Sequence, residues 1–313
     1  MLDWYHSMRG GEPVIYLFPP APLASATVSL ALTPEWHFSA LCPVVDVVKA
    51  DQTKDSKSRV EWTVSAEPDG SLVELASGLE LKYLFWEAES TGFVSDHSGR
   101  RFHPSKPSLD HTNQVVLPFT PFLSHLDAAL SSLALHTSAR NDFVTFWMPH
   151  FTRIRDKGQH VAFRFLSQRE YERAARLDVQ PAPDVVTRVF LLFKGVDPEE
   201  GELSTTSADL VDWVSVVGVD EAKARDEALF RVLEWGGMEV KWGRRCREER
   251  ANAAVEDRRG VRESPATFES LQAGLACSAA CRGREEAHTR SIAKRSLSRG
   301  PSPLAAFERR DEA

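Results

Sequence analysis

The chain has 313 residues, of which 42% are hydrophobic, and its formal net charge is −7. This length suits one large domain or two smaller ones with a sizeable core. No apolar run approaches the roughly 20 residues that cross a bilayer, and the first residues lack the apolar segment of a secretory signal. The sequence therefore predicts a soluble globular protein of the cytoplasm or nucleus, with no membrane span.

Charge is distributed unevenly along the chain. Residues 241–313 hold 16 basic and 11 acidic residues, whereas residues 1–240 hold 22 basic and 34 acidic residues. Binding to nucleic acid needs clustered basic side chains, so the acidic body predicts no nucleic-acid partner. The Arg-rich segment has few aromatic residues and no lasting periodicity, which predicts a disordered tail. We expect an N-terminal extension at 1–10, a single domain at 11–240 and this tail.

The N-terminal third carries the patterns of β-strands. PVIYLF (13–18) is a short apolar run between turn residues, and TVSLAL (27–32) alternates polar with apolar residues. RVEWTVSA (59–66) alternates in the same way, and EPDG (67–70) predicts a type I turn after it. Because SLVEL and ELKYLFWEAE follow, residues 59–89 predict a three-stranded meander.

From Pro118 onward the spacing of apolar residues becomes helical. One helix is expected as far as Leu133, and a second from a cap at Ser138 to a stop at Pro149. The sequence S-Q-R-E at 167–170 has the pattern of a capping box, in which a serine and a glutamate cap the same helix start. A third, short helix should begin there.

Strand patterns return in the C-terminal half. VVTRVFLLFK (185–194) is the most continuous apolar run in the chain and predicts a central strand that is buried on both faces. HVAFRFL (160–166) and FRVLEW (230–235) predict two more strands, the second ended by Gly236 and Gly237. These elements predict an α+β fold with a mostly antiparallel, β-rich N-terminal half, a few helices and further strands.

Two polar stretches rich in turn-forming residues, 49–58 and 90–117, predict exposed loops. The second contains His97, His103 and His111, but their spacings do not match those of structural zinc sites, and no cysteine or carboxylate completes such a pattern. The sequence therefore predicts no metal site and gives no sign of a cofactor.

The stretch ELKYLFWEAE poses a question about its glutamates. Period two places Glu87 on the same face as Tyr83 and Phe85, and glutamates are seldom buried beside rings without a partner. In one interpretation Glu87 is a general acid or an anchor for a polar ligand, with its pKa raised by burial. In the other it forms a structural ion pair with Arg188 or Arg164, each a lone charge in an apolar run.

The pairing of tryptophan with glutamate recurs at Glu234 and Trp235 near the end of the body. Two carboxylates across a cleft are the catalytic groups of glycoside hydrolases, and tryptophan rings suit sugar stacking. Glu87 and Glu234 are therefore the candidate catalytic pair. Short signatures of other enzyme classes are missing from the sequence, so whether the protein is an enzyme stays open.

A resemblance to a known family rests on six stretches: EPVIYLFP (12–19), AEPDGSLV (66–73), YLFWEAES (83–90), NDFVTFWMPHF (141–151), PAPDVVTRVFLLFK (181–194) and LFRVLEWGG (229–237). In this order they resemble a family of uncharacterised bacterial and fungal proteins, with the fungal branch closer. The resemblance implies one domain that ends near Met238 and, since the family has no established activity, no particular reaction. The candidate site residues in these stretches are Trp86, Glu87, Trp147, Arg188, Glu234 and Trp235.

We therefore expect a domain that binds a polar ligand or a protein partner. Its cleft should lie near the strand with Trp86 and Glu87 and the strand end with Glu234 and Trp235, and Trp147 and Arg188 are further candidates for ligand contact. A hydrolase that uses the two glutamates is one alternative. A scaffold that contacts a basic partner through the acidic stretch at 197–229 is the other.

Overall fold

A computed structural model describes residues 9–48, 58–91, 102–201 and 207–240 of the chain. The predicted tail at 241–313 lies outside these residues, as do most of the predicted extension at 1–10 and nearly all of the predicted loop at 49–58. The described residues belong to one compact unit.

The larger of two sheets has seven strands. Its order is β3-β7-β1-β12-β11-β9-β8, and every pair is antiparallel except β11 with β12, which are parallel. The α+β class and the mostly antiparallel pairing predicted from the sequence are confirmed. The strands are β1 (Arg9–Phe18), β3 (Trp36–Cys42), β7 (Leu84–Ser90), β8 (Val115–Leu117), β9 (His160–Phe165), β11 (Val185–Val196) and β12 (Arg231–Glu239).

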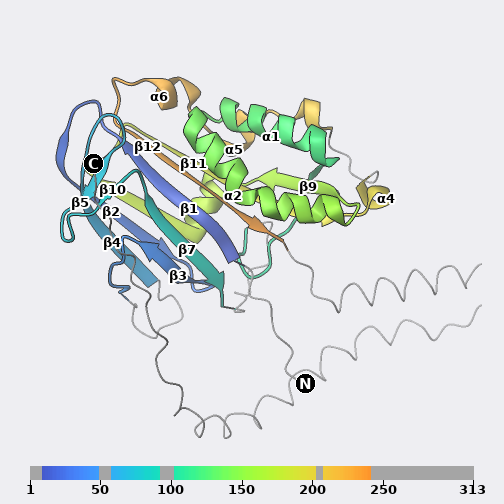
Figure 1. The fold of residues 1–313 in the computed structure, drawn as a ribbon, viewed down its shortest axis with the longest axis horizontal. Coiled ribbons are helices and arrows are strands. Elements are labelled where there is room, and N and C mark those ends of the chain that lie inside the picture. The colour runs from blue at the N-terminus through green and yellow to red at the C-terminus, as the bar shows by residue number, and fades with distance from the viewer. Residues whose placement is uncertain (1–8, 49–57, 92–101, 202–206, 241–313) are drawn as a thin grey trace, which may run out of the picture. The chain divides into compact units, whose positions relative to one another are not determined.

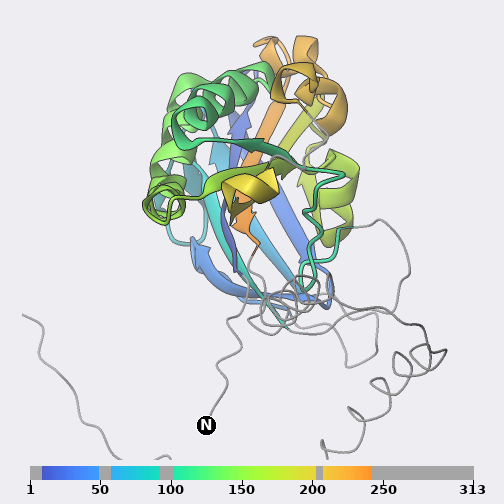
Figure 2. The same cartoon turned by 90° about the vertical axis from the view of Figure 1, so that its right-hand side faces the viewer.

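The smaller sheet has five strands in the order β10-β2-β4-β5-β6, all antiparallel. It packs on one face of the larger sheet, and the helices α1 and α2 cover the other (Figures 1 and 2). The strands are β2 (Leu23–Leu32), β4 (Ser58–Ala66), β5 (Leu72–Glu74), β6 (Glu80–Leu81) and β10 (Ala175–Gln180).

The helices contribute to two separate cores. Helices α1, α2 and α5 pack with one face of the large sheet, whereas Tyr171 and Ala174 of α3 belong to the core between the sheets. Among the described residues, no helix has the length and apolar character to cross a membrane. The helices are α1 (Phe119–Ser132), α2 (Thr137–Asp156), α3 (Gln168–Ala174), α4 (Pro198–Gly201), α5 (Trp213–Val217), α6 (Glu221–Arg225) and the 3-10 helix η1 (Ala208–Leu210).

The central strands of the large sheet are covered on both faces, which explains their apolar sequences. In β1, Ile15 and Leu17 face the small sheet, while Val14 and Tyr16 face the helices. The continuous apolar run of β11 is likewise buried along most of its length, between β12 and β9. Both the central position predicted for this strand and the capping box at 167–170 are confirmed.

The predicted meander at 59–89 is wrong in its third strand. Strands β4, β5 and β6 do form a meander in the small sheet, but β6 has only two residues. The chain then crosses to the large sheet, where β7 lies between β3 and β1. Because Leu84 and Trp86 pack between the sheets and Phe85 packs toward the helices, β7 needs cover on both faces, which the small sheet does not offer.

Two predicted stops are also wrong. Helix α2 is capped by His136 and continues past Pro149 to Asp156, because Phe151 and Ile154 extend its buried face. Strand β12 continues through its two glycines, because Met238 beyond them packs in the core, and glycine suits these positions since Pro13 and β11 lie close to them. A Cβ on Gly237 would lie 3.0 Å from the carbonyl oxygen of Leu191.

The prediction that 90–117 is an exposed loop is wrong for part of its described residues. Phe102 and Leu109 are buried in the core between the sheets, and Lys194 donates a hydrogen bond of 2.6 Å to the carbonyl oxygen of Leu109. The strands β3, β8 and β10 were not expected from the sequence. Strand β8 has only three residues, whereas WHFSA in β3 and ARLDVQ in β10 do alternate apolar with polar residues, so for these two the strand pattern was present in the sequence and was missed.

Candidate functional site

A buried polar network lies between the two sheets. Parallel pairing places Arg188 of β11 beside Glu234 of β12, and the guanidinium Nε donates to a carboxylate oxygen of Glu234. The other oxygen accepts from the indole Nε1 of Trp86 at 3.0 Å and from the hydroxyl of Tyr171 at 3.1 Å. Glu234 is 0% exposed and Arg188 3% exposed, so these charges depend on one another.

The network continues from the large sheet toward the small one. Nη1 of Arg188 donates to the carbonyl oxygen of Ala175, the first residue of β10, at 2.7 Å and to the carboxylate of Glu172. The Glu172 side chain is 43% exposed, so the network reaches solvent there. The guanidinium carbon of Arg188 also lies 4.2 Å from the centre of the Tyr171 ring. The network therefore joins β11 and β12 to α3 and β10.

Burial and charge shift the pKa values of two members of the network. Burial raises the pKa of the Tyr171 hydroxyl well above its usual value, and the negative charge of Glu234 adds to this effect. Burial is the largest single effect on Arg188 and lowers its pKa, but attraction and hydrogen bonding by Glu234, together with Tyr171 and Glu172, outweigh it and leave the pKa raised. Tyr171 thus stays protonated and Arg188 charged, which is the state that holds the sheets together.

The predicted ion pair of Glu87 with an arginine is wrong. Arg188 is bound by Glu234 and Glu172, and Arg164 lies 3.6 Å from Glu170. Glu87 is half-buried and accepts a hydrogen bond of 3.3 Å from the Ser39 hydroxyl. Two strands separate β7 from β11, and Glu87 alternates with Trp86 across the sheet.

The structure brings together only half of the candidate residues. Trp86, Arg188 and Glu234 meet in the buried network, whereas Glu87 lies on the opposite face of the sheet. Trp147 packs against Phe193, and Trp235 against Phe143, in the core under the helices. Glu87 and Glu234 therefore do not face one another across a cleft. The network is a structural link between the two sheets, and the candidates in it do not form an open site.

A cavity of about 440 Å³ opens at one end of the large sheet. Its floor comes from the end of β1 and the start of β12, with Tyr83 just before β7. Its walls come from the turn 68–71 after β4, the connection and first turn that join α1 to α2, and α6. Its lining includes six ring-bearing or basic residues: Tyr16, Phe18, Lys82, Tyr83, His136 and Arg231.

Four rings form one cluster in this cavity. Tyr16 lies at its centre, with the Phe18 ring stacked at 5.9 Å and the Tyr83 and His136 rings edge-on, each at 5.3 Å between ring centres. His136 also meets Phe18 edge-on at 5.5 Å. Tyr16 is buried, while Phe18 and Tyr83 are half-buried. The cluster is therefore part of the core at one side and open to the cavity at the other.

Arg231 is the cation beside these rings. It is paired with Phe18 across β1 and β12, and its guanidinium carbon lies 5.3 Å from the centre of the Phe18 ring. Its Nε is buried and has no hydrogen-bond partner among the described residues. A buried donor without a partner costs about 1–3 kcal/mol, so this group favours a ligand that supplies an acceptor.

His136 contributes a second donor. Its Nδ1 accepts a hydrogen bond of 3.2 Å from the backbone N–H of Ala139, as the cap of α2. His136 is exposed to solvent as a residue, but its ring packs on Tyr16 and Phe18, and this partial burial lowers its pKa; the charge of Asp142 opposes this shift and that of Arg231 adds to it. The ring is therefore neutral near pH 7, and because Nδ1 accepts, the proton is on Nε2.

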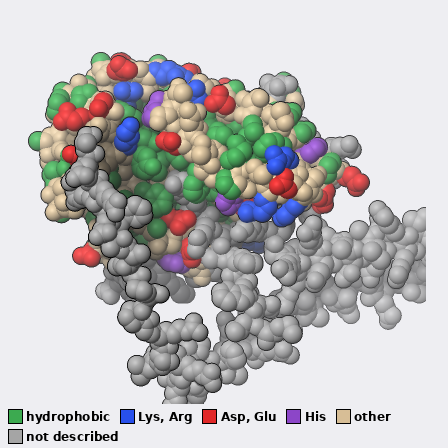
Figure 3. Space-filling view, in the orientation of Figure 1, with side chains coloured by type: hydrophobic (Ala, Val, Ile, Leu, Met, Phe, Trp, Pro, Cys, Tyr) green, Lys and Arg blue, Asp and Glu red, His purple; other side chains and the backbone are tan. Residues whose placement is uncertain are grey.

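The rim of the cavity carries charges of both signs. Lys82, Asp69, Asp142 and Glu227 are all exposed. The Asp69 carboxylate accepts a hydrogen bond of 2.9 Å from the Ser71 backbone, which, with the Ser71 side chain, lowers its pKa. With Arg231 included and His136 neutral, the lining holds two positive and three negative charges. On the face shown in Figure 3, charges of both signs are likewise interspersed.

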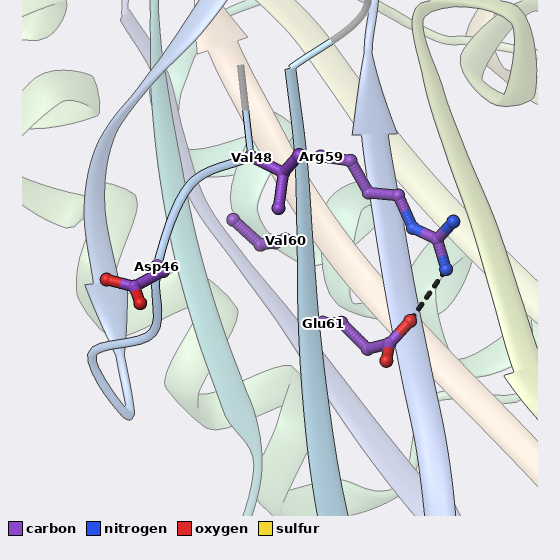
Figure 4. A pocket seen from close by; sticks show the side chains of 5 residues that line it. All are labelled: Asp46, Val48, Arg59, Val60 and Glu61. Carbon is purple, nitrogen blue, oxygen red and sulfur yellow. Dashed lines mark hydrogen bonds and ion pairs between the residues drawn. The ribbon is translucent and has the colours of Figure 1, made fainter. Parts of the chain in front are cut away.

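A second, shallower depression of about 370 Å³ lies beside β4. Figure 4 shows Arg59 and Glu61 pointing toward one another along the strand, with Asp46 and Val48 on the segment that follows β3. Arg59 is already paired with Glu61 and donates to the Ser29 hydroxyl at 2.8 Å. Because Arg59 and Glu61 already have partners, this depression is a weaker candidate than the cavity.

Within the ranges that the structure describes, no three His, Cys, Asp or Glu side chains are grouped in a way that would hold a metal ion. His103, one of the loop histidines, lies 3.9 Å from Glu35.

No pattern in the sequence pointed directly to the cavity. Tyr16 and Phe18 alternate on one face of a predicted strand, and Arg231 interrupts another, but each of these features is common in strands. His136 stands directly before a helix, where its cap function was not recognised. The lining comes from strands, turns and helices far apart in the chain, so only the strand order brings it together.

Comparisons of the chain with protein-family models, with curated proteins and with solved structures found no match. The resemblance drawn from the six stretches stays a prediction. What the fold and the cavity define is a two-sheet α+β domain with a ring-lined pocket at the end of its large sheet.

Proposed function

We propose that this domain binds a small polar ligand in the cavity formed by Tyr16, Phe18, Tyr83, His136 and Arg231. The observation that carries the proposal is the unpartnered Nε of Arg231 beside a cluster of rings. Small-molecule sites are concave, have volumes of roughly 300–1,000 Å³, and combine apolar walls with a few polar groups. A cavity of about 440 Å³ with this lining fits that description.

The cavity lies near the two strands at which the sequence predicted a cleft, but other residues of those strands line it. The cavity lies at the start of β12 and just before β7, which are the strands of Glu234 and Glu87. Neither glutamate lines it. No observation favours a hydrolase that uses this pair, because Glu234 is fully buried and bonded to three donors.

Blocking the cavity tests the proposal. Ser138 is exposed on the first turn of α2 and lines the cavity, so Ser138→Trp fills the space without disturbing the core. Thr145→Trp, at an exposed position on the same helix outside the lining, is the matched control. The probes are four phenyl compounds of similar size: phenylacetate, 2-phenylacetamide, phenethylamine and benzyl phosphate.

Binding is measured by ligand-observed NMR with the full chain. We expect at least one probe to bind the parent and Thr145→Trp but not Ser138→Trp. If no probe shows this difference, the cavity is not a site for small polar aromatic ligands and the proposal fails.

A further inference from the structure

We infer that the ligand of the cavity is a monocarboxylate with a planar aromatic body. This inference rests on the proposed function and adds the chemical class of the ligand. Two features of the cavity determine the class: two N–H donors in its lining, of which Arg231 Nε has no partner among the described residues, and a net negative charge around that lining.

The donors of Arg231 at the floor and His136 in the wall favour an anionic acceptor. Arg231 offers a buried N–H without a partner among the described residues. His136 is neutral with its proton on Nε2, because Nδ1 already accepts from Ala139. A guanidinium and a neutral imidazole together match two oxygens of one carboxylate, and hydrogen bonds to an ionised acceptor are the stronger kind. A ligand ammonium would instead meet the positive charge of Arg231.

The charges of the lining favour a ligand with one negative charge over a ligand with two. Lys82 and Arg231 supply two positive charges, whereas Asp69, Asp142 and Glu227 supply three negative ones. A phosphate monoester, with a charge near −2, would be repelled by the three carboxylates more than a carboxylate with a single charge. The rim therefore selects against phosphates while the floor still attracts one anion.

The rings select the body of the ligand. Tyr16, Phe18, Tyr83 and His136 already contact one another in stacked and edge-on arrangements. Aromatic pairs favour these geometries, and a further ring on the open side of the cluster extends the same pattern. A planar aromatic body placed there lies close to the guanidinium that stacks on Phe18.

The four phenyl probes separate the possibilities because they differ in the charged group. Phenylacetate should bind the full chain about tenfold more tightly than 2-phenylacetamide, and more tightly than phenethylamine or benzyl phosphate. Arg231→Gln should remove this preference, leaving the binding of the amide within about twofold. Lys82→Gln, which removes an exposed cation at the rim, should keep most of the preference.

A second readout does not depend on the stability of a variant. In the parent protein, phenylacetate should raise the pKa of His136, seen in the NMR titration of its ring protons, because a bound anion favours the charged imidazole. The amide should leave that pKa unchanged.

The outcomes separate the inference from the proposed function. If phenethylamine or benzyl phosphate binds most tightly and Ser138→Trp blocks it, the cavity is a site and the carboxylate class is wrong. Equal binding of phenylacetate and its amide, or a preference that survives Arg231→Gln, also overturns the inference. If Ser138→Trp blocks none of the probes, the proposed function itself fails.

Discussion

Replacing Glu234 by glutamine should destabilise the protein strongly. The two side chains have nearly the same shape, but glutamine has one acceptor oxygen where glutamate has two. In the folded protein three donors, from Trp86, Tyr171 and Arg188, converge on the two oxygens. After Glu234→Gln at least one of these donors faces an amide N–H, and Arg188 loses its only fully buried counter-charge.

The magnitude follows from these losses. An unsatisfied buried donor costs about 1–3 kcal/mol, and breaking a buried ion pair costs about 3–5 kcal/mol in all. Since whole domains have unfolding free energies of about 5–15 kcal/mol, the change should be large in urea denaturation. Glu87→Gln is the matched control, because Glu87 is half-buried and accepts a single 3.3 Å hydrogen bond from Ser39. We expect it to change stability by less than about 0.5 kcal/mol.

A double-mutant cycle tests whether the loss comes from the pair itself. Glu234→Gln combined with Arg188→Met should cost less than the sum of the single changes, because the second substitution removes the charge that the first leaves unpaired. A Glu234→Gln protein within about 1 kcal/mol of its parent, or a Glu87→Gln protein that loses as much, would refute the assignment of the buried network.

Three further predictions follow from local features. Tyr171→Phe should cost about 1.5–3 kcal/mol, the worth of a hydrogen bond to a charged group, in urea denaturation at pH 7. Burial raises the pKa of Tyr171 in the folded protein, so the parent should lose stability as the pH rises above about 10, the pKa of tyrosine in the unfolded chain. Tyr171→Phe should not show this loss when urea midpoints are compared between pH 9 and 11. Because burial lowers the pKa of His136, its ring should titrate below 6.5 in NMR spectra of the folded protein. The stability that the neutral ring contributes should be lost as the pH falls from the pKa of the unfolded chain through the lower pKa of the folded one. Pro149→Ala should raise the thermal midpoint, since proline inside a helix costs up to about 3 kcal/mol and α2 continues beyond it; an unchanged or lower midpoint would contradict this.

Local features of the sequence were sufficient for much of the secondary structure. The strand at 13–18, the alternating strands at 27–32 and 59–66, and the capping box at 167–170 depend on neighbours within a few residues, and the structure contains them. The central place of 185–194 could also be predicted, because a strand that is apolar on both faces over most of its length needs cover on both.

The stops at Pro149 and Gly236 were wrong for a reason that lies outside the local sequence. Proline and glycine weaken a helix or a strand, but burial of the residues beyond them outweighs the cost. Helix α2 continues because Phe151 and Ile154 pack in the core, and β12 continues because Met238 does. Local propensity is a weak guide where tertiary packing opposes it.

The partner of each buried charge was decided only by the strand order. The sequence marked Arg188 and Glu234 as unusual and could not pair them, since the pairing depends on β11 and β12 lying parallel and in register. The same holds for Glu87, which the crossing of β7 into the large sheet places far from Arg188. The cavity depends on this order too: Tyr16 and Arg231 are more than two hundred residues apart in the chain, and they share one site because β1 and β12 pair along their length.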